Sequence, residues 1–295
     1  MAPTVPEQIG VIGLGVMGSA MARNLLTAGF QVVGFDIDPQ QRSRFLEMGG
    51  TEASNAGEVA AAADLVVLSL PTTSALAAVV AEIGERASPG LVCLETGTFP
   101  LQAKLDARDA LSKANVDLLD TPLSGTGLQA VDATLVVFAS GSRQGCEQAR
   151  PVFDVIGRST HYLGEFGNGS KMKYIANLLV TVHGLAAAEA HALGIAAGLD
   201  PPSVQKVMED GVGSSKIFEI RGPMMVADDY PAAARLDILL KDAGIIQDFA
   251  RTVGAPTPLL DAALPVYRES SEAGLGDLDA AALCRYLEAL AGLKR

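Results

Sequence analysis

The chain is poor in the residues that form metal sites and disulfide frameworks. Cysteine occurs three times in 295 residues, at Cys93, Cys146 and Cys284, and histidine also three times. An odd number of widely spaced cysteines forms neither a disulfide framework nor a zinc ligand set, and it is typical of proteins in a reducing cytosol. The histidines have no metal-ligand spacing, so no metal site is predicted.

Positive charge is also scarce. Lysine and arginine total 22 against 34 aspartates and glutamates, which gives a net charge of −12. Because the chain has no basic stripe to neutralise the phosphates of a nucleic acid, we expect no nucleic-acid partner. An anionic substrate would then need cations or hydrogen-bond donors placed locally at its site.

No segment is predicted to target the chain to a membrane or to span one. The N-terminus lacks the basic, apolar and small-residue order of a signal peptide. The most apolar later stretch, residues 175–198, contains His183, Glu189 and His191, which a membrane span rarely tolerates. We therefore expect a cytoplasmic protein with no membrane partner.

Apolar residues, in contrast, are abundant. Hydrophobic residues make up 49% of the chain and charged residues 19%. A sizeable core can therefore form, and broad disorder is not expected. The length of 295 residues favours two domains over one.

The most informative segment is residues 9–25, which read IGVIGLGVMGSAMARNL. A short apolar run meets three glycines in the spacing G-x-G-x-x-G, and a helical pattern follows at once. In a dinucleotide-binding fold the first glycine allows a tight turn, the second lets a pyrophosphate approach, and the third lets the helix pack on the strand. Free N–H groups at the helix start face the phosphates. We therefore predict that a dinucleotide binds at Gly13, Leu14, Gly15, Val16, Met17 and Gly18.

The acidic residue that accompanies such a turn is Asp36. It follows the next apolar run, residues 31–35, at about 20 positions from the turn, where a carboxylate accepts hydrogen bonds from the adenosine ribose. This carboxylate would repel the 2′-phosphate of NADP, and no arginine follows directly, since Ile37, Asp38 and Pro39 come next. NAD is therefore the predicted cofactor and NADP the less favoured one. An ordinary strand-to-helix turn with small residues for packing is the alternative interpretation.

Short apolar runs alternate with helical patterns through the first half of the chain. This alternation predicts βαβ units that feed a mostly parallel sheet, with ligands at the carboxyl ends of its strands. The expected strands cover residues 9–13, 31–35, 65–70, 91–95, 117–120 and 135–140, with a last short piece at 161–163. The expected helices between them cover residues 19–28, 40–48, 74–85 and 101–113.

After residue 167 every pattern is helical. Residues 170–198 predict a helix on the order of 40 Å long, and further helices are expected at 203–210, 215–226, 235–253, 258–273 and 279–291. The fold class is thus α/β, with a Rossmann-like parallel-sheet domain over residues 1–165. A long interdomain helix and an all-α domain follow over residues 166–295. A helix so long and apolar needs cover that a second subunit would supply, so we expect a homodimer or homotetramer.

Three further segments supply candidate groups for chemistry. One of them, Lys241-Asp242 inside a helical pattern, is most often a surface ion-pair helix and bears on function only if that helix closes over the cofactor. Residues 120–127 (DTPLSGTG) follow a predicted strand, and a serine hydroxyl with the N–H groups of a glycine-rich turn can hold a carboxylate. The same composition also suits an ordinary loop. In residues 167–177 (GNGSKMKYIAN), Lys173 and Asn177 share one helix face. An amine with an amide one turn away can bind a hydroxyl or carbonyl and move a proton, whereas a lone lysine near a helix end is most often only solvated.

Together these segments resemble the β-hydroxyacid dehydrogenases, the group that includes 3-hydroxyisobutyrate dehydrogenase, tartronate semialdehyde reductase and threonate dehydrogenase. The resemblance runs from about residue 9 to the C-terminus. It rests on the GLGxMGxxMAxNL opening, Leu70-Pro71, ETGTFP at 95–100, DTPLSG at 120–125, GxG at 167–169 with Lys173 and Asn177, and Lys241-Asp242.

The resemblance implies a role for each matched residue. Lys173 would be the catalytic acid/base, Asn177 would anchor the substrate, and Ser124, Gly125 and Thr126 would hold its carboxylate. The implied reaction is the NAD-dependent oxidation of the hydroxyl of a small hydroxy acid, 3-hydroxyisobutyrate-like or threonate-like, or the reduction of the corresponding semialdehyde or ketone. The cofactor would be contacted by the glycine turn and by Asp36, Leu70, Pro71, Thr98 and Lys241.

Four positions depart from the family pattern. Thr126 stands where a second glycine is usual and Ala133 where glycine is common, while Gly97 replaces a frequent serine and Ala176 a frequent asparagine. Because Lys173 is intact, these changes bear on substrate identity more than on activity. Two alternatives stay open. One is an imine reductase of the same architecture, which usually carries another residue at this lysine, and the other is a non-catalytic dinucleotide-binding protein.

Overall fold

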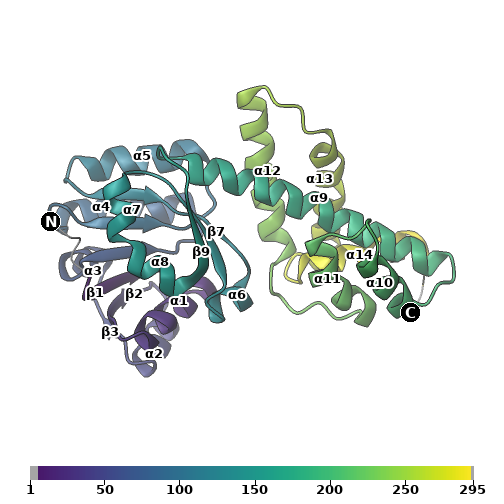
Figure 1. The fold of residues 1–295 in the computed structure, drawn as a ribbon, viewed down its shortest axis with the longest axis horizontal. Coiled ribbons are helices and arrows are strands. Elements are labelled where there is room, and N and C mark those ends of the chain that lie inside the picture. The colour runs from purple at the N-terminus through teal and green to yellow at the C-terminus, as the bar shows by residue number, and fades with distance from the viewer. Residues whose placement is uncertain (1–5, 294–295) are drawn as a thin grey trace. The chain divides into compact units, whose positions relative to one another are not determined.

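The computed structural model describes residues 6–293, which form two compact units. The first unit ends at Lys173 and the second begins at Tyr174. Figure 1 shows that the first unit is built on a β-sheet with helices and that the second is made of helices. The predicted fold class, α/β followed by a long helix and an all-α part, is therefore confirmed.

The first unit contains a six-stranded parallel sheet in the order β3-β2-β1-β4-β5-β6. The strand order changes direction between β1 and β4, and open sheets of this kind bind ligands at that switch point, outside the carboxyl ends of the strands. The glycine turn directly follows β1. The six strands are β1 (Gln8–Ile12), β2 (Gln31–Phe35), β3 (Thr51–Glu52), β4 (Leu65–Leu68), β5 (Val92–Glu95) and β6 (Asp117–Asp120).

Helices cover both faces of this sheet and create two cores. Along β1, Ile9 and Val11 enter one core, whereas Ile12 enters the other, because successive side chains of a strand point to opposite faces. The first core contains side chains of α1 (Val16–Thr27) and α8 (Arg150–Ile156). The second contains side chains of α3 (Ala56–Ala62), α4 (Thr73–Arg86) and α5 (Leu101–Ser112). The remaining helices of this unit are α2 (Pro39–Glu47), α6 (Gly127–Val131) and α7 (Arg143–Gln148).

Two predicted strands, residues 135–140 and the last short piece at 161–163, lie outside the parallel sheet. Residues 135–139 do form a strand, β8 (Leu135–Ala139), but it belongs to a separate three-stranded sheet with β7 (Leu123–Ser124) and β9 (Gly157–Tyr162). β7 and β8 are antiparallel, and β8 and β9 are parallel. The five residues of α6 are too few to form a covering crossover helix, so the chain turns back as a hairpin. The pattern missed β7 because two residues carry no periodicity.

The second unit is helical, and no strand follows β9 in the described residues. The long predicted helix is present as α9 (Asn168–Ala196), 29 residues in length. It begins in the first unit and continues through the second. The later helices agree with the predicted ones to within a few residues. They are α10 (Pro201–Asp210), α11 (Lys216–Ala227), α12 (Leu236–Val253), α13 (Pro258–Ser270) and α14 (Leu283–Leu290).

By length and hydropathy α9 could cross a membrane, and one third of its most apolar stretch is buried within the described residues. Its polar groups, however, have protein partners. His191 is buried and its Nε2 lies 2.9 Å from Oε1 of Gln205 on α10. The Thr181 carbonyl accepts the hydroxyl of Tyr267 on α13 at 3.0 Å. Such contacts are typical of a helix in the core of a folded domain.

A buried tyrosine of the second unit predicts a loss of stability in alkaline solution. Tyr267 on α13 is fully buried, and its hydroxyl donates to the Thr181 carbonyl at 3.0 Å. Burial raises the pKa of Tyr267 to about 12, although Arg221 nearby opposes this shift. Since the unfolded chain releases this proton near pH 10, the stabilising contribution is complete below pH 10 and is lost as the pH rises toward 12.

We therefore expect the free energy of unfolding to fall by up to about 1.4 kcal/mol per pH unit between pH 10 and 12 because of this group. Tyr267→Phe should lose about 1 kcal/mol at pH 8 with the hydrogen bond and show a shallower alkaline decline. Urea unfolding of both proteins at pH 8, 10, 11 and 12 measures the difference. Parallel declines for wild type and variant would contradict the expectation.

Candidate active site

The three glycines of the turn after β1 meet three different local requirements. Gly13 has φ of +90°, and a Cβ there would lie 2.1 Å from the Ser69 carbonyl oxygen. A Cβ on Gly18 would lie 1.8 Å from the Gly13 carbonyl oxygen. Around Gly15, in contrast, no described atom apart from its own chain neighbours lies within 4 Å of a Cβ position. The first and third glycines are thus required by packing, while the second faces open space that a pyrophosphate can approach.

The start of α1 is suited to an anion. Gly15 is the N-cap, so it has no side chain to accept the first N–H groups of the helix, and Val16 is 77% exposed. The uncapped N–H groups and the positive end of the helix dipole favour a phosphate. The Leu14 side chain is fully buried and Met17 packs against the core, so these two residues support the turn from inside.

Asp36 lies beside the glycine turn, as predicted. Its Oδ2 accepts the Leu14 N–H at 2.7 Å and its Oδ1 accepts the Asp38 N–H at 2.8 Å. The carboxylate therefore joins the ends of β1 and β2. The open space at Gly15, the uncapped helix and this carboxylate fit the pyrophosphate and ribose of a nicotinamide dinucleotide.

The sequence interpretation missed an arginine near Asp36. Arg42 on α2 donates through Nη1 to the carbonyls of Asp36, at 2.8 Å, and of Ile37, at 3.2 Å. Its Nε lies 2.6 Å from Oε1 of Glu52. The residues after Asp36 contain no arginine, but the first turns of α2 bring Arg42 back to them. Its charge is paired with Glu52.

The other predicted cofactor residues of the first unit follow neighbouring strands. Leu70 and Pro71 come after β4, and Thr98 comes after β5. Leu70 and Thr98 are half-buried and Pro71 is exposed. A Cβ on Gly13 would lie 3.5 Å from Cδ2 of Leu70. Because parallel strands end at the same sheet edge, all of these residues lie at the carboxyl edge that carries the glycine turn.

The predicted carboxylate-binding segment lies next to the glycine turn. Ser124 ends β7 and is half-buried, while Gly125 is exposed with φ of +140°. A Cβ on Gly127 would lie 2.8 Å from Cγ1 of Val16. The segment therefore packs against the start of α1, and the structure brings two separately predicted motifs together.

Within this segment, Thr126 already has a partner. Its N–H donates to Oε1 of Gln129 at 2.8 Å, and its hydroxyl donates to the same oxygen. Thr126 thereby caps the short helix α6. In the described contacts the Gln129 side chain bonds to Thr126 but not to Ser124 or Gly125, the two other residues predicted to bind the carboxylate.

Lys173 is brought to the same place from 50 residues away. It is half-buried on α9, and its Nζ donates to the Leu123 carbonyl at 2.6 Å. Leu123 directly precedes Ser124. The amine predicted to move a proton therefore lies beside the segment predicted to hold a carboxylate.

In the second unit, Asn177, Lys241 and Asp242 form one group. Asn177 is buried on α9 and its Nδ2 donates to Oδ2 of Asp242 at 2.8 Å. The Nζ of Lys241 lies 2.9 Å from Oδ1 of the same carboxylate. Asp242, which carries no role in the sequence analysis beyond its place in a motif, thus orients the Asn177 amide. Lys173 and Asn177 are four residues apart on the unbroken helix α9, so they share a face.

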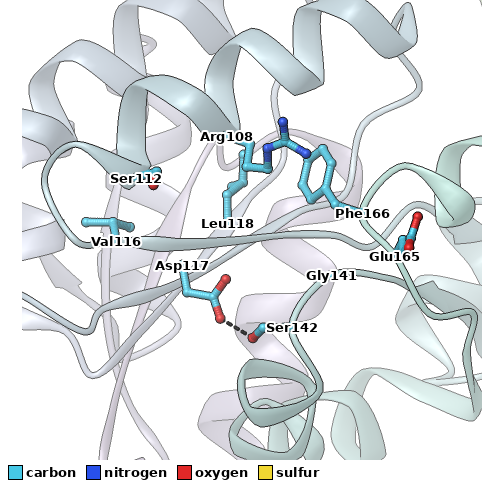
Figure 2. A pocket seen from close by; sticks show the side chains of 9 residues that line it. All are labelled: Arg108, Ser112, Val116, Asp117, Leu118, Gly141, Ser142, Glu165 and Phe166. Carbon is cyan, nitrogen blue, oxygen red and sulfur yellow. Dashed lines mark hydrogen bonds between the residues drawn. The ribbon is translucent and has the colours of Figure 1, made fainter.

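A separate pocket of the first unit contains none of the predicted residues. Figure 2 shows Asp117 bonded to Ser142, and Arg108 beside the ring of Phe166. The guanidinium carbon of Arg108 lies 5.2 Å from the centre of that ring. The pocket lies at the beginning of β6, whereas the candidate site lies at the carboxyl ends of the strands. It is therefore distinct from the candidate active site.

Family descriptions match nearly the whole chain. The NAD-binding domain of 6-phosphogluconate dehydrogenase matches residues 8–164. Residues 167–287 match a second family, which is described as the NAD-binding domain of NADP-dependent 3-hydroxyisobutyrate dehydrogenase. The first match covers more than half of the chain, and it contains the glycine turn, Asp36 and Ser124.

Individual proteins are similar over nearly their whole length. L-threonate dehydrogenase of Cupriavidus necator is 34% identical over 283 residues, with 95% of each chain covered. Among solved structures, 3-hydroxyisobutyrate dehydrogenase from Salmonella typhimurium has a TM-score of 0.87 at 32% identity, covering 95% of this chain and 99% of that one. The Mycobacterium tuberculosis 3-hydroxyisobutyrate dehydrogenase with L-serine has a TM-score of 0.88 at 27% identity, with 96% and 99% covered.

An imine reductase from Pseudomonas sp. shares the fold, with a TM-score of 0.64 at 21% identity over 96% of this chain and 99% of that one. At that identity the likeness concerns architecture alone. The family assignment rests instead on the glycine turn and on the matches that cover both units. The chain belongs to the 3-hydroxyisobutyrate dehydrogenase-like family of β-hydroxyacid dehydrogenases.

Proposed function

We propose that this hydroxyacid dehydrogenase uses NAD to oxidise a small hydroxy acid, 3-hydroxyisobutyrate-like or threonate-like, or to reduce the matching semialdehyde or ketone. The observation that carries the proposal is the Lys173 amine, 2.6 Å from the Leu123 carbonyl and next to Ser124. An acid/base group beside a carboxylate-binding turn is the arrangement that a hydroxy acid requires. The relatives named for L-threonate and 3-hydroxyisobutyrate support the substrate class.

In this mechanism Lys173 acts in its neutral form during oxidation. The hydroxyl proton of the substrate goes to Nζ of Lys173, and the O–H electron pair forms the new carbonyl bond. NAD⁺, when bound, would supply the acceptor for the hydride that leaves the carbon bearing this hydroxyl group. In the reverse direction Lys173 returns the proton to the carbonyl oxygen. The Leu123 carbonyl orients the amine, and the Asn177 amide would hold the substrate hydroxyl.

The substrate carboxylate is assigned to the segment after β7. The Ser124 hydroxyl and the Gly125 N–H supply hydrogen bonds, and Thr126 adds its donors when Gln129 releases them. Such local donors are needed because the net charge of −12 does not attract an anion. The glycine turn, Asp36, Leu70, Pro71, Thr98 and Lys241 would hold the cofactor.

The same proposal includes a cytoplasmic location and a homodimer or homotetramer. Cys93, Cys146 and Cys284 are buried and form no disulfide within the described residues, which suits a reducing compartment. Helix α9 leaves large apolar side chains exposed, among them Ile175 at 57% and Leu193 at 72%. A second subunit would cover such side chains.

Initial rates test the proposed reaction. The purified protein is incubated with NAD and, separately, with 3-hydroxyisobutyrate, threonate, glycerate and other C3–C5 hydroxy acids, and NADH formation is followed at 340 nm. We expect turnover of at least one hydroxy acid. A parallel assay with NADPH and a cyclic imine tests the imine reductase alternative. Turnover of the imine alone, or NADH binding without any turnover, would reject the proposal.

A further inference from the structure

Beneath the start of α9 lies a fully buried group of three ionisable side chains, Glu95, Lys104 and Asp120, here named the Lys104 cluster. Each is 0% exposed. Nζ of Lys104 lies 2.5 Å from Oε2 of Glu95 and 2.8 Å from Oδ1 of Asp120. The two carboxylates stand at the ends of β5 and β6, and the lysine lies in the first turn of α5. The cluster is therefore part of the carboxyl edge of the sheet.

Buried charges such as these are weak evidence for a gain in stability. Two carboxylates and one ammonium give a formal charge of −1 in a site without solvent. Burial raises the pKa of Glu95, and it would lower the pKa of Lys104, but the neighbouring Asp120 and Glu95 carboxylates outweigh this and raise it. Well-packed apolar side chains in place of such buried charges are often neutral or stabilising. The contacts that these charges make indicate a different role.

Asp120 binds the first turn of α9. Its Oδ2 accepts the Ser170 N–H at 2.7 Å, and its Oδ1 accepts the Ser170 hydroxyl at 2.8 Å. The Ser140 hydroxyl, which contacts Asp120 at 3.2 Å, accepts the Gly169 N–H at 2.9 Å. These N–H groups have no partner within the helix, and a negative charge near them is favoured by the helix dipole. The carboxylate thus acts as a cap from 50 residues away.

Lys173 lies one turn beyond this anchored segment. Ser170 is three residues before it on α9, and Asp120 is three residues before Leu123, whose carbonyl binds the Lys173 amine. The same carboxylate therefore holds both chain segments that meet at that hydrogen bond. A Cβ on Gly169 would lie 2.3 Å from the Phe138 carbonyl oxygen, so the helix start has no room to shift toward the sheet.

We propose that the Lys104 cluster positions Lys173: Lys104 holds the Asp120 carboxylate in place, and Asp120 anchors the helix turn that carries the catalytic amine. The proposal rests on the proposed function, in which Lys173 moves the proton. Lys104, Asp120 and Ser170 are positioning residues, since all three are buried and Lys104 and Ser170 each bond to Asp120. Their effect is expected on kcat, because a displacement of about 1 Å at the reacting atoms can cost up to roughly 100-fold.

Ser170→Ala tests the anchor with the smallest change. The variant loses the hydroxyl donor to Asp120 but leaves every charge of the cluster in place. We expect kcat to fall about 10-fold with KM for NAD unchanged within about twofold. Lys171→Met is the matched control, because Lys171 lies on the same turn, is exposed and bonds only to Asn168 in the described contacts. A wild-type kcat in Ser170→Ala would overturn the proposal.

Lys104→Met and Lys104→Met/Glu95→Gln test the charge. The single variant leaves two buried carboxylates without their cation, and we expect kcat to fall by roughly 100-fold. The double variant restores the formal charge of −1, and its amide oxygen still accepts the Gly97 N–H. We expect it to regain about 10-fold in kcat over the single variant. A double variant no faster than the single one would contradict the proposed role of the charge, and if the single variant does not fold, Ser170→Ala decides.

Hydrogen exchange separates this proposal from the proposed function. Amide exchange in residues 169–173 is measured without substrate in wild type, Ser170→Ala and the Lys171→Met control. Faster exchange in Ser170→Ala alone supports the anchor even if the wild type oxidises no hydroxy acid, in which case only the proposed function fails. Unchanged exchange rejects the anchor even if the wild type is an active dehydrogenase.

Discussion

Lys173→Met is expected to lower kcat by about 10²- to 10⁴-fold, the range that a positioned acid/base group contributes. Methionine keeps the apolar stem that makes Lys173 half-buried but cannot accept or return a proton. The dissociation constant of NADH, measured by fluorescence titration, should change less than about twofold, because the groups that fit the cofactor are the glycine turn and Asp36. The loss should therefore be confined to turnover.

Lys171→Met is the control for this result. It removes the same kind of charge two residues earlier on α9, from an exposed side chain that bonds to Asn168 at 3.0 Å. Its kcat should equal that of the wild type. If Lys173→Met kept more than about a tenth of the wild-type kcat, the acid/base assignment would be wrong.

The second large effect concerns the choice between NAD and NADP. We expect the wild type to prefer NAD over NADP by roughly 100-fold in kcat/KM, since the Asp36 carboxylate would repel a 2′-phosphate within a few ångströms. Asp36→Asn combined with Glu52→Gln should narrow this ratio to about 10-fold or less. The double substitution removes the repelling charge and leaves the Arg42 guanidinium without its carboxylate partner, so that its charge can bind the 2′-phosphate.

Glu47→Gln serves as the control, because it removes an exposed carboxylate from the end of α2 without any described contact to Arg42. It should leave the ratio of the two kcat/KM values unchanged. A wild type that prefers NADP would falsify the assignment of Asp36. A double variant with the wild-type ratio would show that Arg42 does not bind the 2′-phosphate.

The sequence predicted those elements whose signals are local. The glycine turn depends on spacing within six residues, and α9 on an unbroken helical pattern, so both are where the sequence places them. The two-residue strands β3 and β7 carry no periodicity of their own and form through pairing with distant segments. For the same reason, the hairpin between β7 and β8 could not be distinguished from another parallel crossover.

The site divides in the same way. Asp36 and Lys173 follow from motifs, whereas the bonds of Asp120 to Ser170 join residues 50 positions apart and leave no sequence signal. The contact of Thr126 with Gln129 was readable, because T-x-x-Q before a helix is a capping-box pattern. The resemblance instead implies that Thr126 binds the substrate carboxylate, so this cap is not among the predicted contacts.

The limit between the two units falls inside α9, between Lys173 and Tyr174, and not in a loop. Genetic truncation of this protein therefore has no neutral cut point there. A fragment that stops at residue 165 would contain the whole glycine turn yet delete Ser170, leaving the fully buried Asp120 without two of its donors. A stand-alone dinucleotide-binding fragment would need to carry at least the first two turns of the helix that follows it.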